Sequence, residues 1–435
     1  MSILLTTTIG FLSVFWGHHL FKKWFNHLSI YSLIWMGMIV LYELKLLPFN
    51  EISLQTWFVT LGAYFSFLLG ILTIISARSV FPQNKIEHEP NMNSFLFLDK
   101  GKKIRFFLIL FSLIGLFSSI QHWNILLSQY GSIGNVILHS QEIYNSRLQG
   151  EEVKGVIPYI WLFSYFGIFL GGLYSAYKGR ITLISLIPVL AVVLKETARF
   201  TRSGILLGLM EFVISFMLAR HLFSGSSSSI KSRLRIILTT SILLIITVLA
   251  ATAVKISRNP IDTYKGSASS ISQFKTGAII SPSVYFYAAS QIGVFNIYLR
   301  EDNEQTQFGN STFFTVYNIL SKFGVAEKPK IFQRGYFIPY WSNTATYLRD
   351  LYSDFGILGP LIVPFLIGML ATFYWFRFYE SKKFIYHVIL THLFILVAIS
   401  FFTLATRFTP WVYGFLILTI LIPLIERINF NRYSN

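Results

Sequence analysis

Three cationic side chains stand close together in a short turn between two apolar stretches of the chain. Lys195 lies at the end of the apolar stretch 181–198, and Arg199 and Arg202 lie between it and the stretch 204–222. The guanidinium group of arginine stays charged and binds phosphate through a planar, bidentate fork. The pattern therefore predicts a site for an anionic group such as a phosphate. The alternative is that these side chains extend to the headgroups of ordinary lipids.

A second set of candidates lies in the long segment 255–353 and directly after it. Arginine, amide, carboxylate and aromatic side chains occur together there, a combination that suits a carbohydrate diphosphate. Aromatic rings stack on sugar faces, polar groups bind hydroxyls, and arginine neutralises phosphate. The alternative is a belt of interfacial Tyr and Trp residues. The candidates are Arg258, Arg334, Tyr340, Trp341, Asn343, Arg349 and Asp354.

Carboxylates that could accept a proton occur near both sets. Glu196, Asp350 and Asp354 lie beside the cations, and Glu211 lies about two turns inside the stretch 204–222. A carboxylate within a membrane is costly and is a functional candidate by default. The alternative for Glu211 is a structural pair with a cation such as Arg202.

Metal and cofactor sites are not expected. The nine histidines are scattered, and none has metal-ligand spacing with a carboxylate partner. There is no cysteine, no phosphate-binding glycine loop and no serine nucleophile elbow.

The composition identifies the class of protein. Hydrophobic residues make up 54% of the 435 residues and charged residues only 13%, which predicts an all-α, polytopic integral membrane protein. The net charge of +17 does not indicate a nucleic-acid partner, because much of it lies in short loops beside apolar stretches, where it meets membrane lipids. We expect about eleven transmembrane helices, within a range of ten to twelve. They are 3–20, 29–48, 54–76, 105–121, 156–177, 181–198, 204–222, 236–254, 356–377, 384–404 and 408–425.

The distribution of Lys and Arg predicts the orientation. One set of loops holds 19 of these residues and the opposite short segments hold seven, so the first set is cytoplasmic by the positive-inside rule. The N-terminus is then outside, the C-terminus is cytoplasmic, and the turn 195–203 faces the exterior.

Three regions follow from these spans. Residues 1–254 hold eight helices and a polar outer loop, 122–155. Residues 255–353 form a large outer loop, whose aromatic content predicts folding with short helices such as 312–323. Residues 354–435 hold the last three helices and a cytoplasmic tail.

The chain resembles the Wzy-type O-antigen and oligosaccharide repeat-unit polymerases of bacteria. The architecture is similar over essentially the full length, and local similarity lies in 201–206, in 285–287 with 308–320, and in 342–359. Related ligases and polymerases often carry a histidine where this chain has Ser342.

The resemblance implies a metal-independent, GT-C-like glycosyltransferase in the bacterial inner membrane. It would transfer a growing glycan from a polyprenyl (undecaprenyl) diphosphate carrier to the sugar of an incoming lipid-linked unit. Arg202, Arg199, Asp354 and Arg349 would be catalytic. Lys195, Arg258, Arg334, Asn343, Tyr340, Trp341 and Glu211 would bind substrate. A chain-length regulator is the expected protein partner.

Two alternatives stay open. One is a ligase that transfers finished glycan from the same carrier, and Ser342 counts weakly against it. The other is a flippase of lipid-linked oligosaccharides, but transporters often show internal repeats and a charged cavity that opens to both faces. Here the unusual cations face outward.

Overall fold

The protein is largely helical in the computed structural model, which describes residues 2–80, 101–149, 155–223, 282–302, 308–381 and 383–428. Six of its helices are long and apolar enough to cross a membrane, which confirms the prediction of a helical membrane protein. Helices occur at ten of the eleven expected spans. The span 236–254 lies outside the described residues, so the count of eleven and the orientation stay predictions.

The chain divides into two compact units. The first comprises residues 1–86, 263–375 and 396–409, and the second comprises 87–262, 376–395 and 410–435. Three helices continue from one unit into the other, namely α16 (Leu358–Ser381), α17 (Phe384–Ile399) and α18 (Thr409–Arg427).

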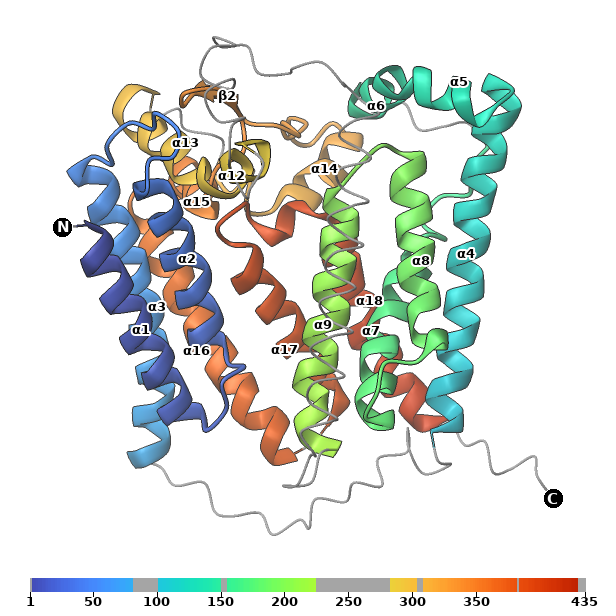
Figure 1. The fold of residues 1–435 in the computed structure, drawn as a ribbon. Coiled ribbons are helices and arrows are strands. Elements are labelled where there is room, and N and C mark those ends of the chain that lie inside the picture. The colour runs from blue at the N-terminus through green and yellow to red at the C-terminus, as the bar shows by residue number, and fades with distance from the viewer. Residues whose placement is uncertain are drawn as a thin grey trace. The chain divides into compact units, whose positions relative to one another are not determined.

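The first unit contains three long helices from the start of the chain. They are α1 (Ser2–Phe21), α2 (His27–Glu43) and α3 (Leu54–Val80), and α1 lies against α2 (Figure 1). The large segment 255–353 and the residues directly after it add α12 (Pro282–Ala289), α13 (Gln291–Ile297), a π-helical turn (Tyr298–Asp302), α14 (Phe314–Lys322) and α15 (Tyr347–Phe355). These helices confirm that the described part of the large loop is folded.

A small hairpin precedes α15. Its strands β1 (Tyr336–Phe337) and β2 (Trp341–Ser342) pair antiparallel, with Tyr336 opposite Ser342. We did not predict it from the sequence, because strands of two residues carry no alternating pattern.

Glycine permits close contact between α3 and α16. A Cβ atom on Gly70 would lie 2.0 Å from the carbonyl oxygen of Phe365, and one on Gly368 would lie 2.3 Å from that of Phe67. Small residues of this kind let two membrane helices approach closely, where packing replaces the hydrophobic effect as the main attraction.

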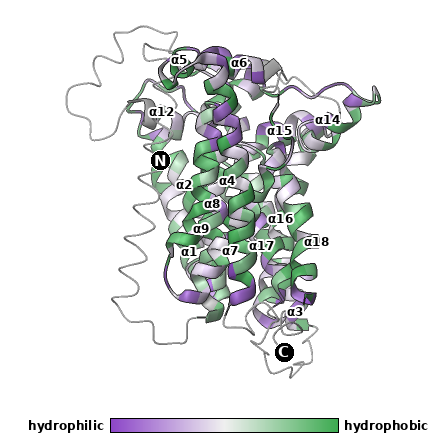
Figure 2. Ribbon diagram, turned by 90° about the vertical axis from the view of Figure 1, so that its right-hand side faces the viewer, coloured by the Kyte–Doolittle hydropathy of each residue, from purple (hydrophilic) through white to green (hydrophobic). Residues whose placement is uncertain are grey.

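The second unit is built around four helices that run side by side. They are α4 (Lys102–Tyr130), α7 (Leu162–Lys178), α8 (Leu183–Ala198) and α9 (Ser203–Phe223). Hydrophobic residues follow these helices along much of their length (Figure 2). The shared core includes Leu108, Phe166, Phe169 and Leu170, all of which are buried.

The segment 122–155, where we expected a polar outer loop, is largely helical in its described part, and we did not predict these helices. Helix α4 continues to Tyr130, and α5 (Ile133–Leu138) and α6 (Ser140–Gln149) follow it. The polar composition suggested a loop, but the indole of Trp123 donates a hydrogen bond of 2.8 Å to the carbonyl of Leu194 on α8. This contact favours continuing α4 alongside α8.

Helix α17 ends at Ile399, before the expected boundary at residue 404. Ser400 is engaged elsewhere, since its hydroxyl accepts 2.8 Å from the Trp35 indole and its carbonyl accepts 2.9 Å from the backbone N–H of Tyr347. These tertiary hydrogen bonds compete with continued helix at that point.

Replacing Gly70 by Ala should weaken the first unit. The new methyl group would collide with the backbone of α16, and overpacking of this kind costs about 1–3 kcal/mol. Thermal unfolding of the purified protein in detergent would measure the loss. Gly37→Ala on α2 is the matched control, because a Cβ there meets nothing within 4 Å. Equal stability of the two variants would contradict the proposed close contact.

Candidate anion and sugar sites

The turn between α8 and α9, residues 199–202, holds the first candidate site. Helix α8 ends at Ala198, and Phe200 adopts a positive φ of 50°. The chain then reverses, and the backbone N–H of Thr201 donates 2.9 Å to the carbonyl of Glu196. Phe200 is buried in a small cluster with Val136 and Ile143. The turn is therefore held by packing as well as by backbone hydrogen bonds.

A buried ion pair lies directly beneath this turn. The Lys195 ammonium is 3.0 Å from Glu196 Oε1 and 3.7 Å from the centre of the Trp161 ring. The side chains of Lys195 and Glu196 are 3% and 6% exposed. The hydroxyl of Thr201 donates to the other oxygen of Glu196. Lys195 is thus occupied inside the protein, and its predicted contact with substrate stays a prediction.

Gly204 makes room for this ion pair. A Cβ atom at this position would lie 2.3–2.6 Å from the carboxylate atoms of Glu196. The first turn of α9 therefore needs a glycine where it passes the buried carboxylate.

Among the described residues, positive charge exceeds negative charge around the pair. The carboxylate of Glu196 interacts electrostatically with Lys195, Arg199 and Arg147. Arg147 comes from α6 and was not among our candidates. Arg147 lies in a polar segment, where an arginine is ordinary, so the sequence did not mark it as a candidate functional residue. Arg199 and Arg202 are both partly exposed, so this end of α8 and α9 presents cations to the surroundings.

Glu211 lies deeper in α9 and is 3% exposed. Its Oε1 has no hydrogen-bond partner within the described residues. The alternative in which it pairs with Arg202 is not seen in this part of the chain, where no salt bridge to Glu211 is formed.

The second candidate site is in the first unit and is centred on α15. Arg407 Nη1 lies 2.5 Å from Asp350 Oδ1, and the two side chains are 11% and 5% exposed. Gln333 also donates to Asp350. Burial raises the pKa of Asp350, while the charge of Arg407 opposes that shift. Arg407 was not among our candidates, although it shares their signal, a basic residue in a short turn that we expect on the outer side.

Arg407 also fastens the segment before the hairpin. Its Nη2 donates to the carbonyls of Lys330 and Ile331, at 3.0 and 2.9 Å, and its guanidinium lies 5.5 Å from the centre of the Phe314 ring. One side chain thus connects α14, α15 and the chain between them.

Arg349 is buried between two tyrosines. Its guanidinium carbon lies 5.0 Å from the ring centre of Tyr298 and 5.1 Å from that of Tyr336, and Nη1 donates 2.7 Å to the carbonyl of Arg334. Burial lowers the pKa of this guanidinium. Its contacts hold the hairpin against the π-helical turn that begins at Tyr298 and against α15, so a structural role is already visible.

Asp354 accepts three hydrogen bonds. They come from the backbone N–H of Ser311 at 3.1 Å and from the backbone and hydroxyl of Thr312 at 2.6 and 2.7 Å. These bonds tie the chain before α14 to α15. The geometry favours this structural role over that of a base, and a catalytic Asp354 stays a prediction.

A cavity of about 590 Å³ lies beside the hairpin. Exposed Arg334 lines it, together with Asn50, Glu301 and the rings of Tyr336 and Phe337. This is the mixture of charge, amide and aromatic surface that suits a sugar. Asn50 and Glu301 were not predicted, because neither stands in a motif and folding alone brings them to this cavity.

The other candidates fall in different surroundings. Trp341 is exposed, Asn343 is partly buried, and Tyr340 is buried with its ring 5.6 Å from that of Phe286. Arg258 lies outside the described residues. Within those residues, no group of three or more His, Cys, Asp or Glu side chains could hold a metal ion.

Removing Arg407 should destabilise the first unit. An Arg407→Gln change leaves a buried carboxylate without its cation, which costs about 3–5 kcal/mol. The double variant with Asp350→Asn should recover part of this loss, measured by thermal unfolding. A deficit of the double variant equal to the sum of the two single variants would contradict the pairing.

The stability lost in the Arg407→Gln variant should depend on pH in a defined direction. Without Arg407, the pKa of Asp350 rises further above its unfolded value, so folding favours the protonated carboxyl. The deficit should be smallest below pH of about 3.9 and grow as pH rises through the folded pKa. Unfolding temperatures across a pH series, with wild-type protein as reference, would show whether the deficit has this sign.

Comparison of the chain with family models, with curated proteins and with solved structures gave no match. The resemblance to repeat-unit polymerases therefore stays a prediction.

Proposed function

We propose that this protein is a polysaccharide polymerase of the bacterial inner membrane. It transfers a growing glycan from a polyprenyl diphosphate carrier to a sugar hydroxyl of an incoming lipid-linked repeat unit. The reaction takes place at the outer face of the membrane, and the product becomes O-antigen, capsule or exopolysaccharide.

The excess of cations at the α8–α9 turn carries this proposal. Three cations interact with the single carboxylate of Glu196, and Arg199 and Arg202 are partly exposed at the ends of two apolar helices. Charge at the end of a membrane helix lies near the depth of lipid headgroups. A lipid-linked diphosphate carries its negative charge at this same depth.

The chemistry requires stabilisation of a leaving group. The acceptor oxygen forms a bond to the anomeric carbon, and the bond from that carbon to the diphosphate oxygen breaks. Its electron pair passes to the diphosphate, while the hydroxyl proton leaves the acceptor. Preorganised guanidinium groups at Arg199 and Arg202 stabilise the charge that develops on the diphosphate. The buried Lys195–Glu196 pair supports the turn from beneath.

The proton needs an acceptor, and the structure bears on the choice. Asp354 and Asp350 are engaged by Thr312 and Arg407, and Glu196 is engaged by Lys195 and Thr201. The departing diphosphate is itself a base, so the reaction does not depend on a free carboxylate.

A polymerase has two lipid-linked substrates, and each unit offers one polar site. The cavity beside the hairpin supplies Arg334, Asn50 and Glu301 with aromatic surface from Tyr336. Arg349 acts there as a positioning residue, since it holds the carbonyl of Arg334. Trp341 belongs to strand β2 of this hairpin and Asn343 follows it directly. Both are candidates for further sugar contacts, as is Arg258. A chain-length regulator would act on the assembled enzyme.

Replacing Arg202 by Ala should abolish long glycan while protein abundance stays unchanged. Loss of one preorganised donor typically lowers the turnover number by about 10²–10³-fold. Gel analysis of glycan length in cells would measure it. Arg180→Ala is the matched control, because this exposed arginine lies in the turn at the opposite end of α8. Glycans of normal length in cells that carry Arg202→Ala would contradict the proposed diphosphate site.

The glycan that accumulates distinguishes the alternatives. A polymerase defect leaves single repeat units on the carrier at the outer face. A ligase defect leaves long chains on the carrier, and a flippase defect traps units on the cytoplasmic side. Either of the last two patterns would replace the proposed function.

The absence of cysteine allows a direct test of orientation. Ser203→Cys places one thiol at an exposed position beside the α8–α9 turn, and Arg180→Cys places one at the other end of α8. A membrane-impermeant maleimide should label position 203 in cells whose outer barrier is opened, and position 180 only after lysis. The reverse pattern would place the cations in the cytoplasm and defeat the proposed reaction.

A further inference from the structure

Helix α14 presents apolar side chains outward. Val316, Ile319 and Phe323, at and just after this helix, are 50%, 39% and 77% exposed. Thr315 is buried instead, at 5%. A helix on the surface of a water-soluble domain normally has the opposite arrangement, with its apolar stripe toward the core.

The position of α14 is fixed by contacts on its other side. Phe314 lies under the Arg407 guanidinium, and Asp354 binds the backbone of Ser311 and Thr312 just before the helix. The hydroxyl of Tyr317 donates 2.5 Å to the carbonyl of Phe308. The apolar face is therefore held outward by specific contacts of the folded loop.

This face continues into the surface of a membrane span. Leu358, Ile362, Leu366 and Leu370 recur every four residues along α16 and are 58%, 50%, 40% and 40% exposed, as expected of a lipid-facing stripe. At the start of that stripe, exposed Ile357 follows the α15 residue Phe355, whose ring meets the Phe308 ring edge-on at 4.9 Å.

Phe308 and Phe313 complete the apolar path. They are 74% and 51% exposed, and Gly309 permits a close approach of the Phe313 ring. Exposed apolar surface thus runs from the membrane span α16 onto α14 without a polar break among these residues.

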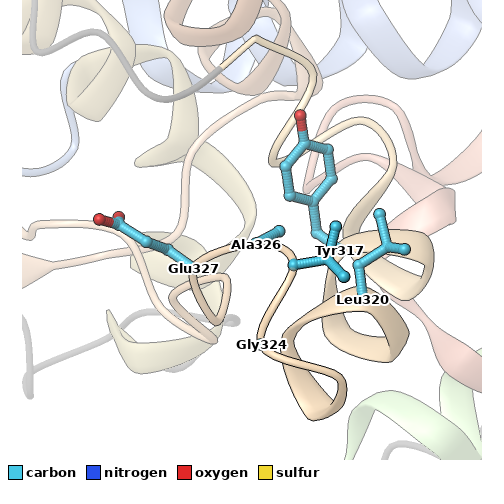
Figure 3. A pocket seen from close by; sticks show the side chains of 6 residues that line it. Tyr317, Leu320, Gly324, Ala326 and Glu327 are labelled. Atoms are coloured by element: carbon cyan, nitrogen blue, oxygen red, sulfur yellow. The ribbon is translucent and has the colours of Figure 1, made fainter.

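Basic residues follow the apolar face. Lys322, Lys328 and Lys330 are exposed, and Glu327 is the single acidic residue between 308 and 332. A cavity of about 570 Å³ lies between α14 and the turn after it, lined by Tyr317, Leu320 and Val325 among others. Figure 3 shows Tyr317 and Leu320 side by side, with the Glu327 carboxylate turned away from them.

We infer that α14 and the turn after it lie in the interfacial layer of the bilayer and bind anionic phospholipid. The apolar face enters the leaflet that surrounds the Leu358 end of α16, and the lysines contact phosphate headgroups. Amphipathic helices with apolar and basic surfaces bind membranes in this way, with the apolar face about 5–10 Å into the headgroup region. The contact would also hold Arg407 and Asp350 at a defined depth.

Spin labels on single cysteines would test the inference in the full-length protein. Ile319→Cys and Phe323→Cys report on the apolar face, and Leu366→Cys is the lipid reference. Glu51→Cys is the water reference, because the Glu51 side chain is 90% exposed. Each labelled protein is placed in nanodiscs of phosphatidylcholine mixed with phosphatidylglycerol. Collision with oxygen, which concentrates in lipid, is compared with collision with a water-soluble nickel chelate.

Labels at 319 and 323 should favour oxygen, as at 366, and differ from the label at 51. Accessibility to nickel equal to that at position 51 would overturn the inference. So would protection from both reagents, which would mean that protein covers the face. The replaced side chains are exposed, and gel filtration of each variant checks folding.

The lipid charge has its own test. A triple Lys322→Gln, Lys328→Gln, Lys330→Gln variant should move the label at 323 toward water in the mixed nanodiscs. It should have a smaller effect in nanodiscs of phosphatidylcholine alone. Equal shifts in the two lipids would refute the anionic headgroup as the ligand. Spin-label accessibility does not measure glycosyl transfer. The proposed function can therefore fail while this inference holds, and the inference can fail while the proposed function holds.

Discussion

The cost of burying charge in an apolar protein governs both candidate sites. An isolated ion inside a membrane protein is expensive, and it persists only where an opposite charge or hydrogen bonds compensate it. Glu196 is compensated by Lys195 and by the hydroxyl of Thr201, and Asp350 by Arg407 and Gln333. Each compensated carboxylate then organises its neighbourhood. Glu196 requires the glycine at 204, and Arg407 joins α14 to α15.

This constraint separates supporting residues from residues that can meet a substrate. Lys195, Arg349 and Asp354 each make ion-pair or hydrogen-bond contacts inside the protein. These contacts support the fold, and the predicted roles of the three residues toward substrate stay predictions. Arg199 and Arg202 are partly exposed and Arg334 is exposed, so all three present their charge at the protein surface. A lipid diphosphate would bind the exposed arginines. Its affinity would depend on the supporting residues, because they hold the backbone in place.

Several features followed from the sequence because they depend on local composition. The apolar runs, the helices in the large loop and the cation-rich turn between two spans needed only hydropathy and charge. Arg407 was missed although its signal matched that of Arg199, since a lone arginine in an outer turn is hard to distinguish from a lipid contact. Asn50 and Glu301 had no signal at all, because only the folded loop brings them beside Arg334.

The sequence by itself determined that this chain is a helical membrane protein with unusual cations in a short turn, since hydropathy and charge act residue by residue. Tertiary structure alone decided which of those charged side chains form ion pairs inside the protein. Pairing of Lys195 with its neighbour Glu196 depends on Trp161 and Thr201 closing around them. The outward apolar face of α14 likewise depends on Arg407, which lies 85 residues after Lys322, the last residue of that helix. Only the contacts of the folded protein decide which face of a helix is buried and which is exposed.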